Sequence, residues 1–120
     1  MKDNGFFERA LSDTVHFHSI YDEKYKTEYL TLFFSLPLTA ENAACASLTA
    51  RVLQRGSRSF PTMKELSRAL DENYACSVGA GAFKCGEREI FSLNLVNVKD
   101  RYALSGEKIF DRGAEILFDL

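Results

Sequence analysis

The stretch from Thr39 to Gly56, TAENAACASLTARVLQRG, predicts an apolar helix that packs closely against a neighbouring layer. Thr39 can cap this helix through its hydroxyl, with Asn42 at the third helical position, and Gly56 supplies the expected stop. Alanines recur through the helix, and small side chains allow a helix to approach a sheet closely. The following segment, SRSFPTMKEL, opens a second helix at a T-x-x-E capping box formed by Thr62 and Glu65.

The apolar residues of this second helix, Met63, Leu66, Leu70 and Tyr74, are spaced by three and four positions. That spacing is typical of an amphipathic helix with one stripe facing a core. A last helix is expected within GEKIFDRGAEILFDL, at the end of the sequence, where apolar residues again recur at helical spacing.

Strands are predicted on both sides of the two central helices. Alternation or runs of branched and aromatic residues predict them at 14–20, 29–36 (buried), 76–83 and 89–98, with the polar KCGERE as a hairpin turn between the last two. The first dozen residues are expected to be irregular or a short helix. The order strand, strand, helix, helix, strand, strand, helix predicts an α+β fold, a two-layer sandwich of a mainly antiparallel sheet with helices on one face.

Size and composition limit the classes of protein that fit. A chain of 120 residues with 46% hydrophobic content is expected to form a single soluble domain, and its net charge of −2 gives no reason to expect nucleic acid or a membrane surface as partner. No run approaches the roughly 18 apolar residues that span a bilayer. The N-terminus has acidic residues where a signal peptide would have an uninterrupted apolar stretch, so export is not expected. Three cysteines without a C-x-x-C favour free thiols and a cytoplasmic location. The uncapped end favours a chain cut from a longer protein.

Residues 24–120 resemble the N-terminal part of a domain of the insulinase-type (pitrilysin, M16) metallopeptidases. The resemblance is carried by EYLTLFFSLPL, by the helix ending in VLQRGSRSFP, by TMKELSRALDENYA, and by the hairpin and closing helix. KYKTEYLTLFFSLPLT and VLQRGSRSFPTMKEL are most similar to a non-catalytic branch found in bacterial gene pairs, in which one protein lacks the zinc motif and the other keeps it. The resemblance implies an insulinase-like domain that is present only in part within residues 1–120.

Active members of that family carry the zinc motif H-x-x-E-H on the helix that corresponds to residues 39–56. The resemblance places the two histidines of the motif on Ser47 and Arg51 and its general-base glutamate on Ala50. Ser47 and Arg51 cannot bind zinc as the histidines do, and Ala50 cannot act as a general base. The positive charge of Arg51 also opposes the binding of a metal ion. The resemblance therefore implies no catalytic residue, no cofactor and no metal in this chain, with zinc held by a catalytic partner.

The resemblance also implies how such a chain would act. It would be part of an inactive half that closes a chamber around a peptide and holds an insulinase-like catalytic subunit carrying H-x-x-E-H. In active relatives an edge strand after the second helix pairs with the substrate backbone, and the corresponding residues are Gly79, Ala80, Gly81, Ala82 and Phe83. These five residues and Arg51 are the candidate peptide or partner contacts. Close packing within the sheet is the competing interpretation of the small residues.

Two other functions remain open from the sequence. His16 and His18 lie two apart on a predicted strand, so they share a face and could contribute to a zinc site in an active peptidase whose other ligands come from elsewhere. A polar, solvent-facing side of the strand is the simpler interpretation of this pair. The cluster Arg51, Arg55, Arg58, Lys64 and Arg68 could instead bind phosphates in a small nucleic-acid-binding α+β module.

Overall fold

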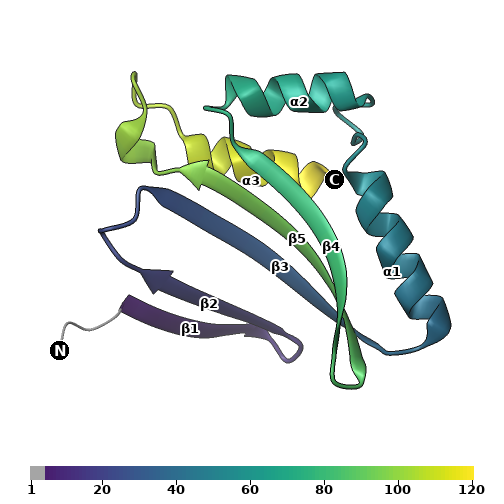
Figure 1. Cartoon of the computed structure of the whole chain (residues 1–120). Coiled ribbons are helices and arrows are strands. Elements are labelled where there is room, and N and C mark those ends of the chain that lie inside the picture. The colour runs from purple at the N-terminus through teal and green to yellow at the C-terminus, as the bar shows by residue number, and fades with distance from the viewer. Residues whose placement is uncertain (1–4) are drawn as a thin grey trace.

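A computed structural model describes residues 5–120 and shows two antiparallel sheets and three helices (Figure 1). In chain order the elements are β1 (Gly5–Ser12), β2 (Val15–Tyr21), β3 (Thr27–Pro37), α1 (Ala40–Leu53), α2 (Met63–Glu72), β4 (Ser77–Cys85), β5 (Arg88–Val98), the short 3-10 helix η1 (Asp100–Tyr102) and α3 (Ile109–Asp119). Strands β1 and β2 form a hairpin of their own, and β3, β5 and β4 form a second sheet in that order. Both outer strands of the three-stranded sheet, β3 and β4, are therefore edge strands.

The core lies between one face of the three-stranded sheet and the helices. Leu93 and Leu95 of β5 pack with Leu117 of α3, and the partly buried Leu53 and Leu70 bring α1 and α2 against the same cluster. The helices thus cover a single face of the sheet, as Figure 1 shows for α3, which crosses behind β4 and β5. The chain is an α+β two-layer sandwich, and this confirms the fold class that the sequence predicts.

The two central helices begin where their caps predict. The Thr39 hydroxyl accepts the main-chain N–H of Asn42 at 3.1 Å, and the capping box of Thr62 and Glu65 forms in both directions. The predicted stop of the first helix was wrong in detail: α1 ends at Leu53. Gly56 instead lies where an added Cβ would meet the carbonyl oxygens of Phe60 and Pro61 at 2.8 Å, so its role is a close approach in the loop.

The stripe predicted for the second helix holds only in its middle. Leu66 is buried and Leu70 is half-buried, but Met63 is 55% exposed. Tyr74 lies beyond the end of α2 with φ of +59°, and its hydroxyl donates to Glu107 at 3.0 Å. The spacing of the apolar residues continues as far as Tyr74, beyond the end of the helix. The sequence pattern alone therefore does not show at which residue the helix ends.

Two strand predictions need correction. The first dozen residues were expected to be irregular or helical, but β1 is a strand from Gly5 that pairs with β2, while residues 1–4 lie outside the described part of the chain. The strand at 29–36 was expected to be buried. As an edge strand, β3 buries neither Tyr29 (71% exposed) nor Phe33 (66% exposed), because these side chains lie on the face of the sheet opposite the helices.

Candidate functional site

Helix α1 carries the three residues, Ser47, Ala50 and Arg51, that were singled out from the sequence. Ser47 and Arg51 are exposed on α1, and Ala50 is 5% exposed because it belongs to the row of small residues against the sheet. Within residues 5–120 no cluster of three or more His, Cys, Asp or Glu side chains is arranged to hold a metal ion. The structure therefore places Ser47, Ala50 and Arg51 on α1, and in the described residues no cluster of three possible metal ligands lies beside them.

Strand β4 lies beside α1 and presents an open main-chain edge. Cys85 and Arg88 flank a two-residue turn, and residues that close such a turn exchange both main-chain hydrogen bonds. The odd-numbered residues of β4 therefore bond to β5. The N–H and C=O groups of the even-numbered residues Val78, Ala80 and Ala82 point outward, and none of them has a main-chain partner on that side in the described chain.

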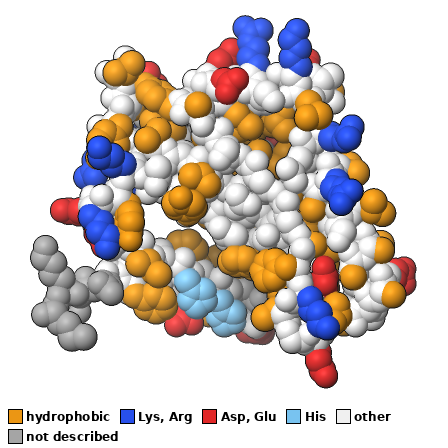
Figure 2. Space-filling view, viewed as in Figure 1, with side chains coloured by type: hydrophobic (Ala, Val, Ile, Leu, Met, Phe, Trp, Pro, Cys, Tyr) orange, Lys and Arg blue, Asp and Glu red, His pale blue; other side chains and the backbone are white. Residues whose placement is uncertain are grey.

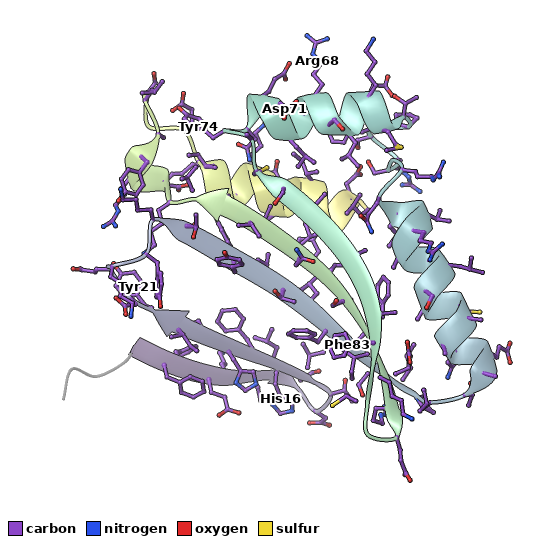
Figure 3. The ribbon with its side chains drawn as sticks, in the orientation of Figure 1. His16, Tyr21, Arg68, Asp71, Tyr74 and Phe83 are labelled. Atoms are coloured by element: carbon purple, nitrogen blue, oxygen red, sulfur yellow. The ribbon has the colours of Figure 1, made fainter. Side chains whose placement is uncertain are left out.

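The small residues of β4 serve packing on both faces of the sheet. An added Cβ at Gly79 would lie 2.9 Å from Asn94 Oδ1, and at Gly81 it would lie 3.6 Å from Ser92 Oγ. Ala80 faces the helices and packs against the core. Phe83, labelled in Figure 3 near the lower end of β4, is half exposed on the face without helices. Close packing thus accounts for Gly79, while at Gly81 an added Cβ would make only an ordinary contact. Of the outward main-chain groups, Ala80 O accepts a bond from Gln54 and the N–H groups remain available for pairing.

Gln54 shows which flank of α1 faces this edge. The Gln54 side chain, directly after α1, donates to Ala80 O at 3.0 Å and to Ala50 O at 2.9 Å. At 100° per residue, Gln54 lies between the buried Ala50, about 40° away, and Arg51, about 60° away on the other side, with Ser47 about 20° from Gln54. Ser47 and Arg51 are therefore on the exposed side of α1 that adjoins the Gln54 contact with β4.

The residues of the predicted basic cluster differ in their partners in the structure. Arg68 forms an ion pair with Glu72, with Nε and Oε1 2.9 Å apart, and Figure 3 shows it pointing away from the sheet. The pKa of Asp119 is lowered chiefly by its hydrogen bonds from Ser57 and Ser59, and the nearby charge of Arg58 adds to the same effect. Arg51 and Arg55 form neither an ion pair nor a side-chain hydrogen bond with any residue of 5–120. Figure 2 shows Lys and Arg side chains over α2 and along the side of the molecule where α1 lies.

His16 and His18 lie on one face of the β1–β2 hairpin, as the sequence predicts. His18 pairs across the hairpin with Glu8 and stacks on Phe6, with ring centroids 6.1 Å apart. Both histidines are exposed, and Figure 2 shows them together among apolar side chains. The hairpin is separate from the sheet that carries β4, so the pair does not belong to the α1–β4 site.

A polar cluster that the sequence does not reveal joins the α1–α2 loop to the end of α3. The Asp119 carboxylate accepts hydrogen bonds from the Ser57 hydroxyl and from the Ser59 main-chain N–H and hydroxyl, the latter two at 2.9 Å. These bonds, that of Ser57 above all, hold the pKa of Asp119 below its ordinary value of 3.8. The cluster fixes the loop that follows Arg55. Residues 57 and 119 are too far apart in sequence for any local pattern to have shown it.

The three cysteines are unpaired, as expected from the sequence. Cys45 and Cys85 are exposed, and Cys76 is buried, which raises the pKa of its thiol. None of the helices between residues 5 and 120 has the length and apolar character needed to cross a bilayer.

Comparison with known proteins gives one informative similarity. No protein-family model and no curated protein matches the chain. Among solved structures the chain is similar to the crystal structure of a conserved protein from Enterococcus faecalis V583, with a TM-score of 0.88 and 28% sequence identity. The match covers 95% of this chain and 27% of that one, so this chain spans about a quarter of the length of its structural neighbour.

Proposed function

We propose that this chain is part of a non-catalytic insulinase-like protein that binds an extended peptide along the edge of β4. The observation that carries the proposal is the position of that edge. Outward main-chain groups of β4 lie beside the end of α1, and α1 carries Ser47 and Arg51. In the resemblance to the insulinase-type peptidases these two residues take the place of the zinc-binding histidines. An edge of this kind can add a peptide as a further strand through main-chain hydrogen bonds.

The proposal includes a partner and a location. A chain without metal ligands at this position needs zinc and a general base from a second insulinase-like subunit that carries H-x-x-E-H. Three unpaired cysteines support a reducing, cytoplasmic location. Co-expression of this chain with such a subunit, followed by purification of both, should give peptidase activity that neither subunit shows alone.

Hydrogen exchange tests the binding edge directly. A neutral extended peptide of about ten residues, rich in Thr and Ala, should slow exchange of the outward amides of Val78, Ala80 and Ala82, because each would gain a partner. The same peptide with N-methyl groups on alternate residues keeps its side chains but lacks the donors, so it should give no protection. Unchanged exchange at all three amides with saturating peptide would disprove pairing at this edge.

A proline substitution provides the matching protein variant. Ala82→Pro removes an N–H that points outward, so the ladder to β5 keeps its bonds, and proline is tolerated on an edge strand of this kind. We expect Ala82→Pro to weaken peptide binding while Ala82→Ser, which keeps the N–H, binds as the unchanged protein does. Circular dichroism and the melting temperature of both variants check that each one folds.

A further inference from the structure

We infer that the β4 edge selects extended acidic segments with carboxylates at alternate positions, recognised by Arg51 and Arg55. This inference rests on the proposed function, because it names the chemical class of peptide that the same edge would take. It goes beyond that function because strand addition alone has no preference for charge: main-chain bonds are common to all peptides.

The two arginines lie on either side of Gln54 in the sequence, and Gln54 marks where α1 meets the edge. Its side chain donates to Ala80 O, so the end of α1 that carries Arg51 adjoins the outward groups of β4. Arg55 follows Gln54 in the turn that ends α1, and its N–H donates to Val52 O at 2.9 Å. The bonds of Asp119 to Ser57 and Ser59 hold the chain just beyond this turn. The main chain that carries both arginines is thus held next to the Gln54 contact with β4.

Arg51 and Arg55 form no ion pair within residues 5–120, and the carboxylate held nearest to this turn, that of Asp119, is already bonded to Ser57 and Ser59. The sequence contains no Asp or Glu between Glu41 and Glu65, and β4 itself contains none. Glu41 lies ten residues before Arg51 on α1, roughly 15 Å along the helix axis. The protein as a whole is mildly acidic, with a net charge of −2. A local positive flank without internal partners therefore favours an acidic partner over a neutral one.

The spacing of the arginines matches an extended chain. Arg55 lies four positions after Arg51, in the turn that continues from α1, and four positions of helix would correspond to about 6 Å along the axis. Side chains on one face of a strand repeat at about 6.6 Å, every second residue. Glutamates at alternate positions of an added strand would therefore meet both arginines, whereas adjacent glutamates would point to opposite faces. Arginine also suits this role because its guanidinium can bind a carboxylate through two hydrogen bonds.

The test compares peptides that differ only in charge and spacing. The probe is a fluorescent Thr/Ala peptide of about ten residues with Glu at two alternate positions, and its partners carry Gln at the same positions or two adjacent Glu residues. By fluorescence anisotropy at low salt, we expect the full chain to bind the alternate-Glu peptide about five- to tenfold more tightly than the Gln peptide. The adjacent-Glu peptide should fall between the two, and added salt should reduce the difference.

Two double variants locate the effect. Arg51→Gln with Arg55→Gln should remove the preference for the acidic peptide and leave binding of the Gln peptide unchanged. Lys64→Gln with Arg68→Gln removes the same total charge from α2 and should keep the preference. Equal loss in both double variants would mean that only net charge matters and would overturn the inference.

The results distinguish failure of the acidic-peptide inference from failure of the proposed function. If Glu and Gln peptides bind equally and both protect the β4 amides, the inference fails and the proposed function stands. If no peptide protects those amides, both fail. A single-stranded DNA oligonucleotide that binds through Arg51 and Arg55 without affecting the β4 amides would assign the flank to nucleic acid and overturn the acidic-peptide assignment.

Discussion

Gln54 connects the end of α1 to the edge of β4, with its Nε2 atom 3.0 Å from the main-chain oxygen of Ala80. The same nitrogen donates to Ala50 O at 2.9 Å. One side chain thus satisfies the last turn of a helix and an outward carbonyl of an edge strand, and it sets which flank of α1 faces that strand.

We expect Gln54→Met to lower the free energy of unfolding by about 1 kcal/mol, because two hydrogen bonds are lost while most of the side-chain volume stays. In a domain of 120 residues that corresponds to a fall in melting temperature of roughly 3–6 °C per kcal/mol. Thr49→Met, at an exposed position of α1 with no side-chain hydrogen bond in the described structure, is the control. Equal urea midpoints for the two variants would show that the Gln54 bonds contribute nothing.

Gly113 of α3 packs directly against Leu95 of β5, which is fully buried. An added Cβ at this glycine would lie 3.0 Å from both methyl carbons of Leu95, and a side chain with no exposed surface has little room to move. Overpacking costs about 1–3 kcal/mol, whereas alanine gains about 1 kcal/mol over glycine in a helix. We expect Gly113→Ala to destabilise the protein by about 1 kcal/mol in urea unfolding.

The same substitution in a Leu95→Val background tests the cause. Valine is shorter, so Gly113→Ala should cost less there than in the unchanged protein, and a double-mutant cycle measures the difference. An identical cost in both backgrounds would assign the effect to the backbone of α3 instead of the contact with Leu95.

Asp119 links acid stability to the α1–α2 loop. The Ser57 hydroxyl, and then the Ser59 N–H, hold the pKa of Asp119 below 3.8 in the folded state. A depressed pKa means that the carboxylate stabilises the fold at any pH above its unfolded value. That stabilisation is lost as the pH falls through the lower, folded value. Asp119→Asn should therefore melt at a lower temperature than the unchanged protein at pH 7.

The difference between the two melting temperatures should shrink as the pH is taken below 3.8, and differential scanning calorimetry across that range measures it. Comparing the two proteins at each pH cancels the contributions of Asp22 and Glu107, whose pKa values are also lowered. A difference that stays constant to the lowest pH would contradict the role given to the Asp119 charge.

Zinc content separates the proposed function from an active zinc peptidase that uses His16 and His18. We expect the purified chain, loaded with zinc and then dialysed, to keep far less than one equivalent, because a stable site needs about three protein ligands. His16→Ala with His18→Ala should leave the zinc content unchanged when it is measured by mass spectrometry of the metal. A full equivalent that disappears in the double variant would favour the peptidase.

The sequence predicted the parts of this fold that depend on local interactions. The caps at Thr39 and Thr62 involve residues three apart, so the starts of α1 and α2 could be placed from the sequence. The β4–β5 hairpin was predicted for the same reason, since its turn residues are adjacent. β1 was missed because its apolar side chains lie on both faces of an exposed hairpin and do not alternate with polar ones.

The tertiary structure alone decided the geometry of the candidate site. Which strand is an edge depends on the sheet order β3-β5-β4, and pairing between β3 and β5 joins residues about 50 to 70 positions apart in the chain. The flank of α1 that faces β4 follows from the contact of Gln54 with Ala80, and the fixed loop after Arg55 follows from Asp119. The sequence determined that Ser47, Ala50 and Arg51 bring neither histidine nor carboxylate to α1, because that is a property of side-chain chemistry. Only folding placed the helix that carries Arg51 beside β4, because distances between distant residues are set by packing.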